Sequence, residues 1–292
     1  MNEFQKFGMN PIGIYEKAFP ASLPWEERLA QAAIAGYDFV EMSIDVSEER
    51  LSRLEWSPST RSALRHVIKS TGTPILTMGV SGHRDFPLGS PSQKVRARSL
   101  EILYRAIDLA NDLGIKIIQL MGYDVFNETS DKGTQERFIQ GLVQGTHWAG
   151  AAGVMLALEN VDVDTVDSVE KALRFVKSVN SPWLNLYPDM GNLVAAGFDP
   201  VKQLKHAEGY LVGVHVKDAV PGEVRGVVFE KGIVPFNKVF QTLAEMGYSG
   251  PLAVEMWAHL DKTGDPVQAA AEAQQLVRSL LHSTARMIEG DR

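Results

Sequence analysis

The sequence predicts an α/β fold, a (β/α)8 barrel, and three observations support this class. Short apolar runs recur eight times along the 292 residues. Longer amphipathic segments lie between these runs, so strands and helices alternate as they do in a barrel. The first run, 11–17, is not followed by the glycine-rich phosphate-binding fingerprint that the rival doubly wound sheet usually carries.

The apolar runs predict buried parallel strands, because each is rich in Val, Ile, Leu or aromatic residues. In chain order they span 11–17, 39–44, 75–80, 116–122, 154–160, 184–190, 211–218 and 251–257. The helices that we expect between and after them include 24–36, 94–114, 134–153, 199–207 and 265–290. Several of these segments end in Gly, a common helix C-terminal signal.

The composition is that of an ordinary globular protein, with a formal net charge of −7 and no cysteine. The acidic balance argues against nucleic-acid binding, and the missing cysteines exclude disulfides and thiolate ligands. We expect no signal peptide at 1–17 and no membrane helix, so a cytoplasmic location is the default. We find no linker-like segment and expect 1–292 to form a single barrel domain.

Polar side chains stand at the ends of the last four predicted strands. The fifth strand ends with Glu159, the sixth with Asp189, the seventh contains His215 and the eighth contains Glu255. The active site of a (β/α)8 barrel lies at the carboxyl ends of its strands, where these four side chains would converge.

The type of these side chains predicts a metal site. Taken singly, a strand-end glutamate is more often a helix cap or an ion-pair partner, and His215 could be a core histidine. Facing buried carboxylates repel one another, however, and a divalent cation between them removes that cost. Three carboxylates and one imidazole suit Mn²⁺, Mg²⁺ or Co²⁺, with Zn²⁺ also possible.

Two carboxylates on opposite sides of a substrate suggest paired acid and base chemistry. A cation that binds a carbonyl and its neighbouring hydroxyl acidifies the carbon between them and stabilises an enediolate. With Glu159 and Glu255 as the pair, proton exchange at C3 inverts a ketose. Proton transfer between C1 and C2 would make the same apparatus an aldose–ketose isomerase.

Several motifs carry a family resemblance over about residues 11–288: "IGIYEKAFP", "SGHRDFPLGS", "PWLNLYPDMGNL", "GVHVKDAVPG" and "GPLAVEMW". Together they resemble the L-ribulose-5-phosphate 3-epimerases, also called L-xylulose-5-phosphate 3-epimerases and formerly hexulose-6-phosphate isomerases. The resemblance implies a xylose isomerase-like barrel that binds one divalent metal ion through Glu159, Asp189, His215 and Glu255. It also implies that the two glutamates are the acid/base pair of a carbohydrate-phosphate isomerase, and that the enzyme is a homodimer.

A sugar-phosphate substrate requires cations or backbone amides, which barrels often supply from the loops after strands seven and eight. We predict substrate contacts from Lys217 and Arg225 after the seventh strand and from His83 after the third. Glu41, which lies in the second strand, is a further candidate. Each has a plainer alternative: Lys217 could pair with a carboxylate, Arg225 could be a solvated loop charge, and Glu41 could orient His83 or form an ion pair.

Other functions remain open from the sequence alone. The nearest are an aldose–ketose isomerase, a dehydratase, and an epimerase of a free ketose. A barrel endonuclease would need several metal ions and more strand-end histidines, whereas of the seven His in this chain only His215 and His83 stand at predicted strand ends. The acidic net charge also argues against a DNA substrate. A non-catalytic sugar-binding barrel would be expected to lack one of the four candidate ligands.

Overall fold

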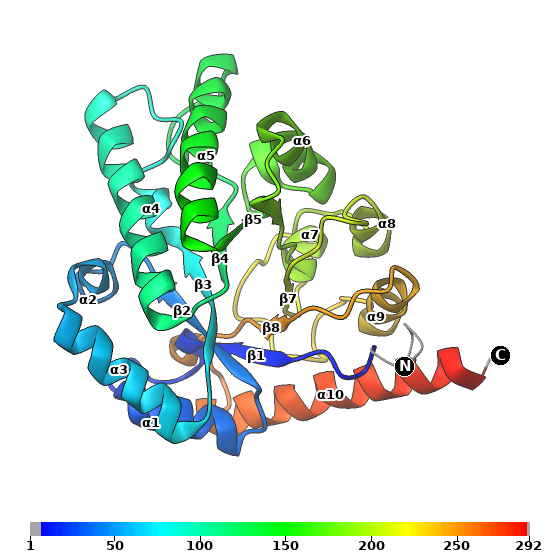
Figure 1. Ribbon diagram of the computed structural model, residues 1–292. Coiled ribbons are helices and arrows are strands. Elements are labelled where there is room, and N and C mark those ends of the chain that lie inside the picture. The colour runs from blue at the N-terminus through cyan, green and yellow to red at the C-terminus, as the bar shows by residue number, and fades with distance from the viewer. Residues whose placement is uncertain (1–6, 291–292) are drawn as a thin grey trace.

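A computed structural model describes residues 7–290, and within them eight parallel strands form one sheet (Figure 1). The sequence predicts no signal peptide over residues 1–17, and residues 1–6 of this stretch lie outside the described residues. The strands are β1 Ile12–Tyr15, β2 Phe39–Ile44, β3 Ile75–Val80, β4 Ile117–Met121, β5 Met155–Glu159, β6 Leu184–Leu186, β7 Val214–Val216 and β8 Leu252–Val254. Each lies inside a run that the sequence predicts, and the (β/α)8 class is confirmed.

The sheet closes into a ring, but the strand pairing is less extensive at one junction than at the others. The sheet order is β6-β5-β4-β3-β2-β1-β8-β7, so β1 pairs with both β2 and β8. Between β6 and β7 the pairing is reduced to isolated bridges at Leu186–Leu211 and Asp189–His215. We call this junction the β6–β7 seam. Two of the four predicted metal ligands therefore face each other across it.

The helices surround the strands on the outside (Figure 1). They are α1 Trp25–Ile34, α2 Glu48–Leu51, α3 Pro58–Thr71, α4 Gln93–Leu113, α5 Lys132–Ala152, α6 Val169–Val179, α7 Met190–Ala195, α8 Pro200–Lys205, α9 Phe236–Glu245 and α10 Pro266–Gly290. Single 3₁₀ turns are η2 Glu16–Ala18, η3 Ser52–Glu55, η4 Ser81–Arg84, η5 Asp164–Val166 and η6 Ala258–Leu260. The five predicted helices correspond to α1, α4, α5, α8 and α10.

Local sequence signals explain where the helices begin and end. The Ser92 side chain accepts a backbone N–H at the start of α4, and Asp131 forms a capping box at the start of α5. Both helices end at glycines with left-handed backbone, Gly114 at φ 78° and Gly153 at φ 67°. Among the described helices, none has both the length and the apolar character that crossing a membrane requires.

The core is divided into two regions by the strands. A large outer cluster packs the strands against the helices, and a small inner cluster fills the barrel. The inner cluster consists of Phe39, Ile117, Ala157, Tyr187 and Ala253. Its two aromatic rings fit because glycines lie beside them, Gly13 in β1 and Gly213 directly before β7. A methyl group on Gly13 would lie 2.1 Å from Phe39, and one on Gly213 would lie 2.1 Å from Tyr187.

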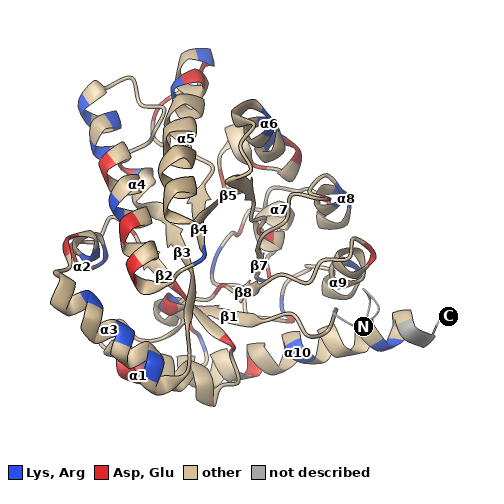
Figure 2. Ribbon diagram, in the orientation of Figure 1, with Lys and Arg blue, Asp and Glu red and all other residues tan. Residues whose placement is uncertain are grey.

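Many charged residues lie on the outer helices, as Figure 2 shows for α4, where basic and acidic positions follow one another along the ribbon. Arg105 and Arg98 both pair with Glu101 on this helix. Such exposed pairs contribute little to stability. A different set of ionisable groups, which includes Glu159, Asp189, His215 and Glu255, is buried.

Candidate metal centre

Four side chains converge at the carboxyl ends of β5 to β8. Glu159 is the last residue of β5, and Asp189 follows β6 as the N-cap of α7. His215 is the middle residue of β7, and Glu255 directly follows β8. All four are buried, and one ligand atom from each lies within 4.8 Å of the others. The structure thus brings together the four residues that the sequence predicts as metal ligands; we call them the cluster.

The two ring nitrogens of His215 face different carboxylates. Nδ1 lies 2.8 Å from Glu159 Oε1 and 3.9 Å from Asp189 Oδ2, on the side of the cluster. Nε2 lies 2.6 Å from Glu41 Oε1, on the opposite side of the ring. Burial works to lower the pKa of His215, but the neighbouring carboxylates, Glu41 first, hold that pKa well above 6.5.

A buried ammonium group supplies the positive charge in this acidic surrounding. Lys217 Nζ lies 2.8 Å from Asp189 Oδ2, 2.7 Å from Glu255 Oε2 and 2.8 Å from Asn192 Oδ1. Burial works to lower the pKa of Lys217, but Asp189 and then Glu255 raise it above its ordinary value. The lysine therefore pairs with carboxylates, the alternative that its sequence position leaves open.

The two glutamates of the cluster have opposite surroundings. Burial raises the pKa of Glu159 to about 7, although His215 works against this rise. Burial would also raise the pKa of Glu255, but Lys217 and His215 outweigh it and lower the pKa to about 2. One carboxyl can therefore hold a proton near neutral pH, while the other stays ionised, which is the arrangement that acid/base catalysis needs.

The donor atoms of the cluster fit a divalent cation. Asp189 Oδ2 is buried and lies 2.8 Å from Lys217 Nζ, but it accepts no well-aligned hydrogen bond. Its other oxygen, Oδ1, is held 2.7 Å from the backbone nitrogen of Asn192 at the start of α7. A carboxylate oxygen without a well-aligned hydrogen bond, beside two more carboxylates and an imidazole nitrogen, is a suitable ligand set for Mn²⁺, Mg²⁺, Co²⁺ or Zn²⁺.

A cavity of about 300 Å³ opens at the cluster, and we call it the main cavity. Glu159 and Glu255 line it, together with the aromatic rings of Tyr15, Tyr123 and Trp257. Its basic lining residues are Lys17, Arg84, Lys217 and Arg225. A volume of this size is at the lower end of small-molecule sites, and its polar lining suits a small hydrophilic ligand.

The predicted substrate contacts divide into two groups. Lys217 and Arg225 line the main cavity, and the Arg225 guanidinium lies 5.7 Å from the Trp257 ring centre. His83 and Glu41 are not among its described lining residues. His83 is buried, with Nε2 3.3 Å from the Ser99 carbonyl oxygen in α4, and burial lowers its pKa to about 4.

Arg84, the neighbour of His83, is exposed to the main cavity, whereas His83 is not among its described lining residues. Arg84 lines the main cavity, and its Nη2 donates to the Tyr123 hydroxyl at 2.8 Å. The turn η4, Ser81–Arg84, follows β3 directly, so the alternation of the strand no longer decides which residue faces the barrel mouth. The sequence alone therefore did not distinguish His83 from Arg84.

Two further residues, not predicted from the sequence, hold Glu159 of the cluster and Glu41 beside it. Gln119 Nε2 donates to Glu159 Oε2, and the Tyr187 hydroxyl donates to Glu41 Oε2 at 3.0 Å. The signal for Gln119 was present, because it is the only polar residue in the run "IIQLM" and its position alternates with outward-facing neighbours. Tyr187 gave no such signal, since an aromatic residue in a strand is usually core.

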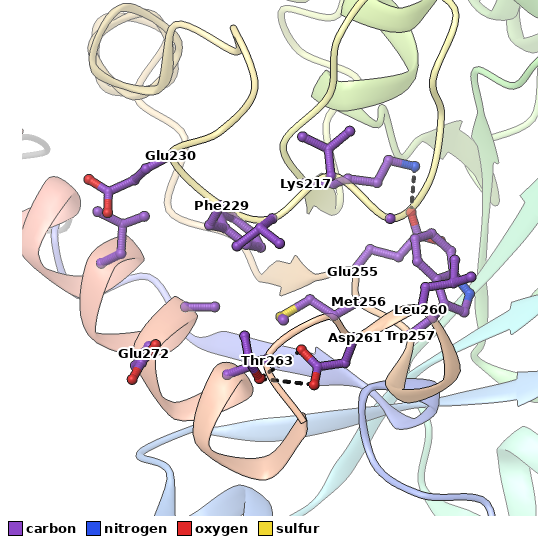
Figure 3. Close-up of a pocket in the computed structure, with 16 residues that line it drawn as sticks. Lys217, Phe229, Glu230, Glu255, Met256, Trp257, Leu260, Asp261, Thr263 and Glu272 are labelled. Carbon is purple, nitrogen blue, oxygen red and sulfur yellow. Dashed lines mark hydrogen bonds and ion pairs between the residues drawn. The ribbon is translucent and has the colours of Figure 1, made fainter. Parts of the chain in front are cut away.

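A second, smaller cavity of about 130 Å³ lies beside the main one, between the loop after β7 and the start of α10 (Figure 3). Lys217, Glu255 and Trp257 line both cavities. Figure 3 shows the Lys217 side chain meeting Glu255 at this common wall. The Lys217–Glu255 pair thus forms part of the partition between the two cavities.

Known proteins match nearly the whole chain. Residues 29–280 match the family described as Xylose isomerase-like TIM barrel. The L-ribulose-5-phosphate 3-epimerase of Escherichia coli O139:H28 (strain E24377A / ETEC) is 45% identical over 279 residues, covering 96% of this chain and 97% of that relative. The protein of the same name from Escherichia fergusonii (strain ATCC 35469) is 44% identical over the same shares.

Solved structures agree on the fold. A structure of L-ribulose 3-epimerase has a TM-score of 0.82 at 23% identity, covering 96% of this chain and 97% of that chain. D-psicose 3-epimerase with D-tagatose from Clostridium cellulolyticum H10 has a TM-score of 0.80 at 18% identity, covering 93% and 99%. At such identities the likeness is one of fold.

The comparisons confirm the xylose isomerase-like barrel and the resemblance on which it was predicted. They also confirm the predicted enzyme class, since the relatives at 44–45% identity are epimerases, which are isomerases. The chain therefore belongs to the xylose isomerase-like TIM barrel family, beside the relatives named L-ribulose-5-phosphate 3-epimerase.

Proposed function

We propose that this chain is a divalent-metal-dependent 3-epimerase that interconverts L-ribulose 5-phosphate and L-xylulose 5-phosphate. The observation that carries the proposal is the cluster of Glu159, Asp189, His215 and Glu255 at the main cavity. The name of the relatives at 44–45% identity supports the choice of substrate.

The metal ion would be held by the four cluster residues. When bound, a divalent cation polarises the ketose carbonyl and its neighbouring hydroxyl, which makes the C3 proton more acidic. The remaining requirement is a pair of groups that remove and return a proton on opposite faces of C3. Side chains of the protein, rather than the metal ion, would remove and return this proton.

Glu159 and Glu255 meet this requirement because they come from different walls of the barrel. Glu159 ends β5 and Glu255 follows β8, so β6 and β7 separate them along the ring. One carboxylate takes the proton from C3, and the other, protonated, delivers a proton to the opposite face. In the reverse direction the two exchange roles.

Other side chains hold these two carboxylates in place. Lys217 Nζ lies 2.7 Å from Glu255 Oε2, and Gln119 donates to Glu159 Oε2. Fixed hydrogen bonds of this kind reduce the reorganisation that proton transfer requires. The phosphate group would be balanced by basic residues of the main cavity, of which we propose Arg225 as one.

Exchange with deuterated solvent tests the reaction class. Metal-loaded protein is incubated with L-ribulose 5-phosphate in D₂O, and the recovered sugars are analysed for the position of deuterium. Deuterium at C3 of both ketose phosphates supports the proposal. Label at C1 or C2 without label at C3 indicates an aldose–ketose isomerase instead, turnover of free ketoses alone indicates a free-ketose epimerase, and saturating metal without any turnover indicates a sugar-binding barrel.

A further inference from the structure

Glu41 is a buried carboxylate that the reaction proposed above does not use. It lies in β2, opposite a bulge in β3: Val40 pairs with Ile75 and Glu41 with Thr77, so Leu76 of β3 has no partner in β2. The bulge re-aims Thr77, whose hydroxyl reaches Glu41. Glu41 is completely buried and is not among the described lining residues of the main cavity.

Three donors of the protein contact the carboxylate of Glu41. Oε1 lies 2.6 Å from His215 Nε2. Oε2 accepts from Thr77 Oγ1 at 2.7 Å and from the Tyr187 hydroxyl at 3.0 Å. The two hydroxyl donors fix one oxygen, and this leaves the other directed at the imidazole ring. The network orders a single geometry between Glu41 and His215.

This geometry decides which nitrogen of His215 is available to the cluster. An ionised Glu41 can only accept, so the proton of the hydrogen bond must be on Nε2. The lone pair of a neutral imidazole then lies on Nδ1, and Nδ1 is the atom that faces Glu159 Oε1 at 2.8 Å and Asp189 Oδ2 at 3.9 Å. A carboxylate behind a histidine in this way fixes its tautomer and ring orientation for metal binding.

We propose that Glu41 is the positioning residue of the metal site: held by Thr77 and Tyr187, it keeps the proton of His215 on Nε2 and directs Nδ1 at the metal. The inference rests on the proposed metal-dependent function. It assigns to Glu41 an effect on the metal affinity of the protein, exerted entirely through His215.

The test is a titration of Mn²⁺ into the metal-stripped full chain without sugar, with free Mn²⁺ followed by electron paramagnetic resonance. Glu41→Gln is expected to raise the Kd for Mn²⁺ about 10- to 100-fold, the usual effect of removing such a partner. The matched control is Asp124→Asn. Asp124 is also fully buried and also accepts from two hydroxyls, Ser130 Oγ and Thr134 Oγ1, each at 2.6 Å, but it is not in the cluster.

A structural role and a positioning role give different results. Both variants are expected to lower the thermal midpoint of the metal-free protein, but only Glu41→Gln should raise the Kd. A Kd within twofold of wild type for Glu41→Gln overturns the proposal, and so does an equal rise in both variants. If Glu41→Gln does not fold, the double variant Thr77→Val/Tyr187→Phe replaces it. This variant keeps the charge of Glu41 but removes both hydroxyl donors to it. An unchanged Kd for Mn²⁺ in the double variant overturns the proposal.

Turnover of L-ribulose 5-phosphate, measured in parallel on the wild type, separates this inference from the proposed function. Wild type that binds Mn²⁺ without turnover overturns the proposed function, while the Kd of Glu41→Gln still judges the role of Glu41. Turnover in the wild type with an unchanged Kd in Glu41→Gln overturns only the role of Glu41. Wild type that binds neither Mn²⁺, Co²⁺ nor Zn²⁺ overturns both.

Discussion

Glu159 and Glu255 are the same residue type in two different settings. The first meets a histidine and a glutamine amide, and the second meets a lysine ammonium. The structure therefore gives the two carboxyl groups unequal proton affinities before any ligand binds. At the scale of single residues, the proposed reaction depends on this inequality and on the charges that cause it.

Replacing either glutamate by glutamine should stop epimerisation while leaving the barrel folded. Glu159→Gln and Glu255→Gln are each expected to lower kcat about 10²- to 10⁴-fold, the usual contribution of a general acid or base. The measurement is turnover of L-ribulose 5-phosphate at saturating metal, with circular dichroism to follow the fold. Glu208→Gln, at an exposed position, is the control. Wild-type turnover in either cluster variant would contradict the two-glutamate mechanism.

Removing the buried ammonium should destabilise the metal-free protein. Lys217→Met leaves Asp189 and Glu255 without the cation that lies between them, and breaking a buried pair in this way costs about 3–5 kcal/mol. Urea denaturation in the presence of a chelator measures the loss. Adding Mn²⁺ should reduce the deficit, because the metal restores positive charge. The control is Lys202→Met, since that side chain is 83% exposed; an equal loss there would contradict this account.

At the scale of elements, the inner face of the barrel depends on the complementarity of glycine and aromatic side chains. Gly213 in front of β7 leaves room for the Tyr187 ring, which also packs edge-on against His215 with ring centres 4.9 Å apart. The Tyr187 ring thus connects the packing inside the barrel with the position of His215.

Gly213→Ala should disturb this arrangement. Its methyl group would lie 2.1 Å from the Tyr187 ring, and overpacking of this kind typically costs about 1–3 kcal/mol. The free energy of unfolding from urea denaturation is the measurement. Gly82→Ala is the control, because a methyl group there meets no atom closer than 3.7 Å. Equal stability of wild type and Gly213→Ala would show that the ring can move away without cost.

The sequence predicted the elements well because their patterns are local. The predicted runs 39–44 and 75–80 coincide with β2 and β3, whereas the predicted run 211–218 shortens to Val214–Val216. The four cluster residues could be predicted because strand ends of a barrel share one rim. The roles of His83 and Glu41 could not, because the turn η4 decides where His83 points, and the bulge in β3 decides which side chain of that strand meets Glu41. Neither irregularity has a periodic signal.

At the scale of the whole molecule, the cluster spans the weakest part of the ring. Asp189 and His215 lie on either side of the β6–β7 seam, where only isolated bridges were formed. Glu159 and Glu255 come from the strands that flank it, β5 and β8. A metal ion bound by all four would therefore connect four strands across this junction.

Metal removal should accordingly lower the stability of the entire barrel. A ligand at 100 times its Kd adds about 2.7 kcal/mol to the free energy of unfolding. Urea denaturation with Mn²⁺ and with a chelator measures the difference in wild type and in Asp189→Asn. The variant should respond much less, since it lacks one of the ligands. An equal response of the two proteins would place the stabilising ion elsewhere.

The stability of the metal-free protein should also depend on pH in a defined direction. Glu159 has an ordinary pKa of 4.5 and a pKa of about 7 in the folded chain, so folding favours its protonated form. Below about pH 4.5 this shift contributes its full stabilisation to the folded protein. The contribution to the free energy of unfolding is lost progressively as the pH rises from about 4.5 to about 7. His215, whose folded pKa is raised above 6.5, does not oppose this slope.

Comparison with Glu159→Gln isolates this contribution, because glutamine cannot ionise. The free energy of unfolding of wild type relative to this variant should fall between pH 4.5 and 7 in the presence of a chelator. The measurement is urea denaturation of both proteins at a series of pH values. A difference that stays constant or rises over this window would contradict the raised pKa of Glu159.

The position of Glu255 behind β8 also sets an order of events during protein synthesis. The first three cluster residues leave the ribosome earlier, but the ring closes only when β8 pairs with β1, joining segments about 240 residues apart, as in Ile12 with Leu252. Contacts this distant in sequence form slowly. A nascent chain therefore has an incomplete site until β8 has been made, and a metal ion held by all four cluster residues would bind only after β8 is translated.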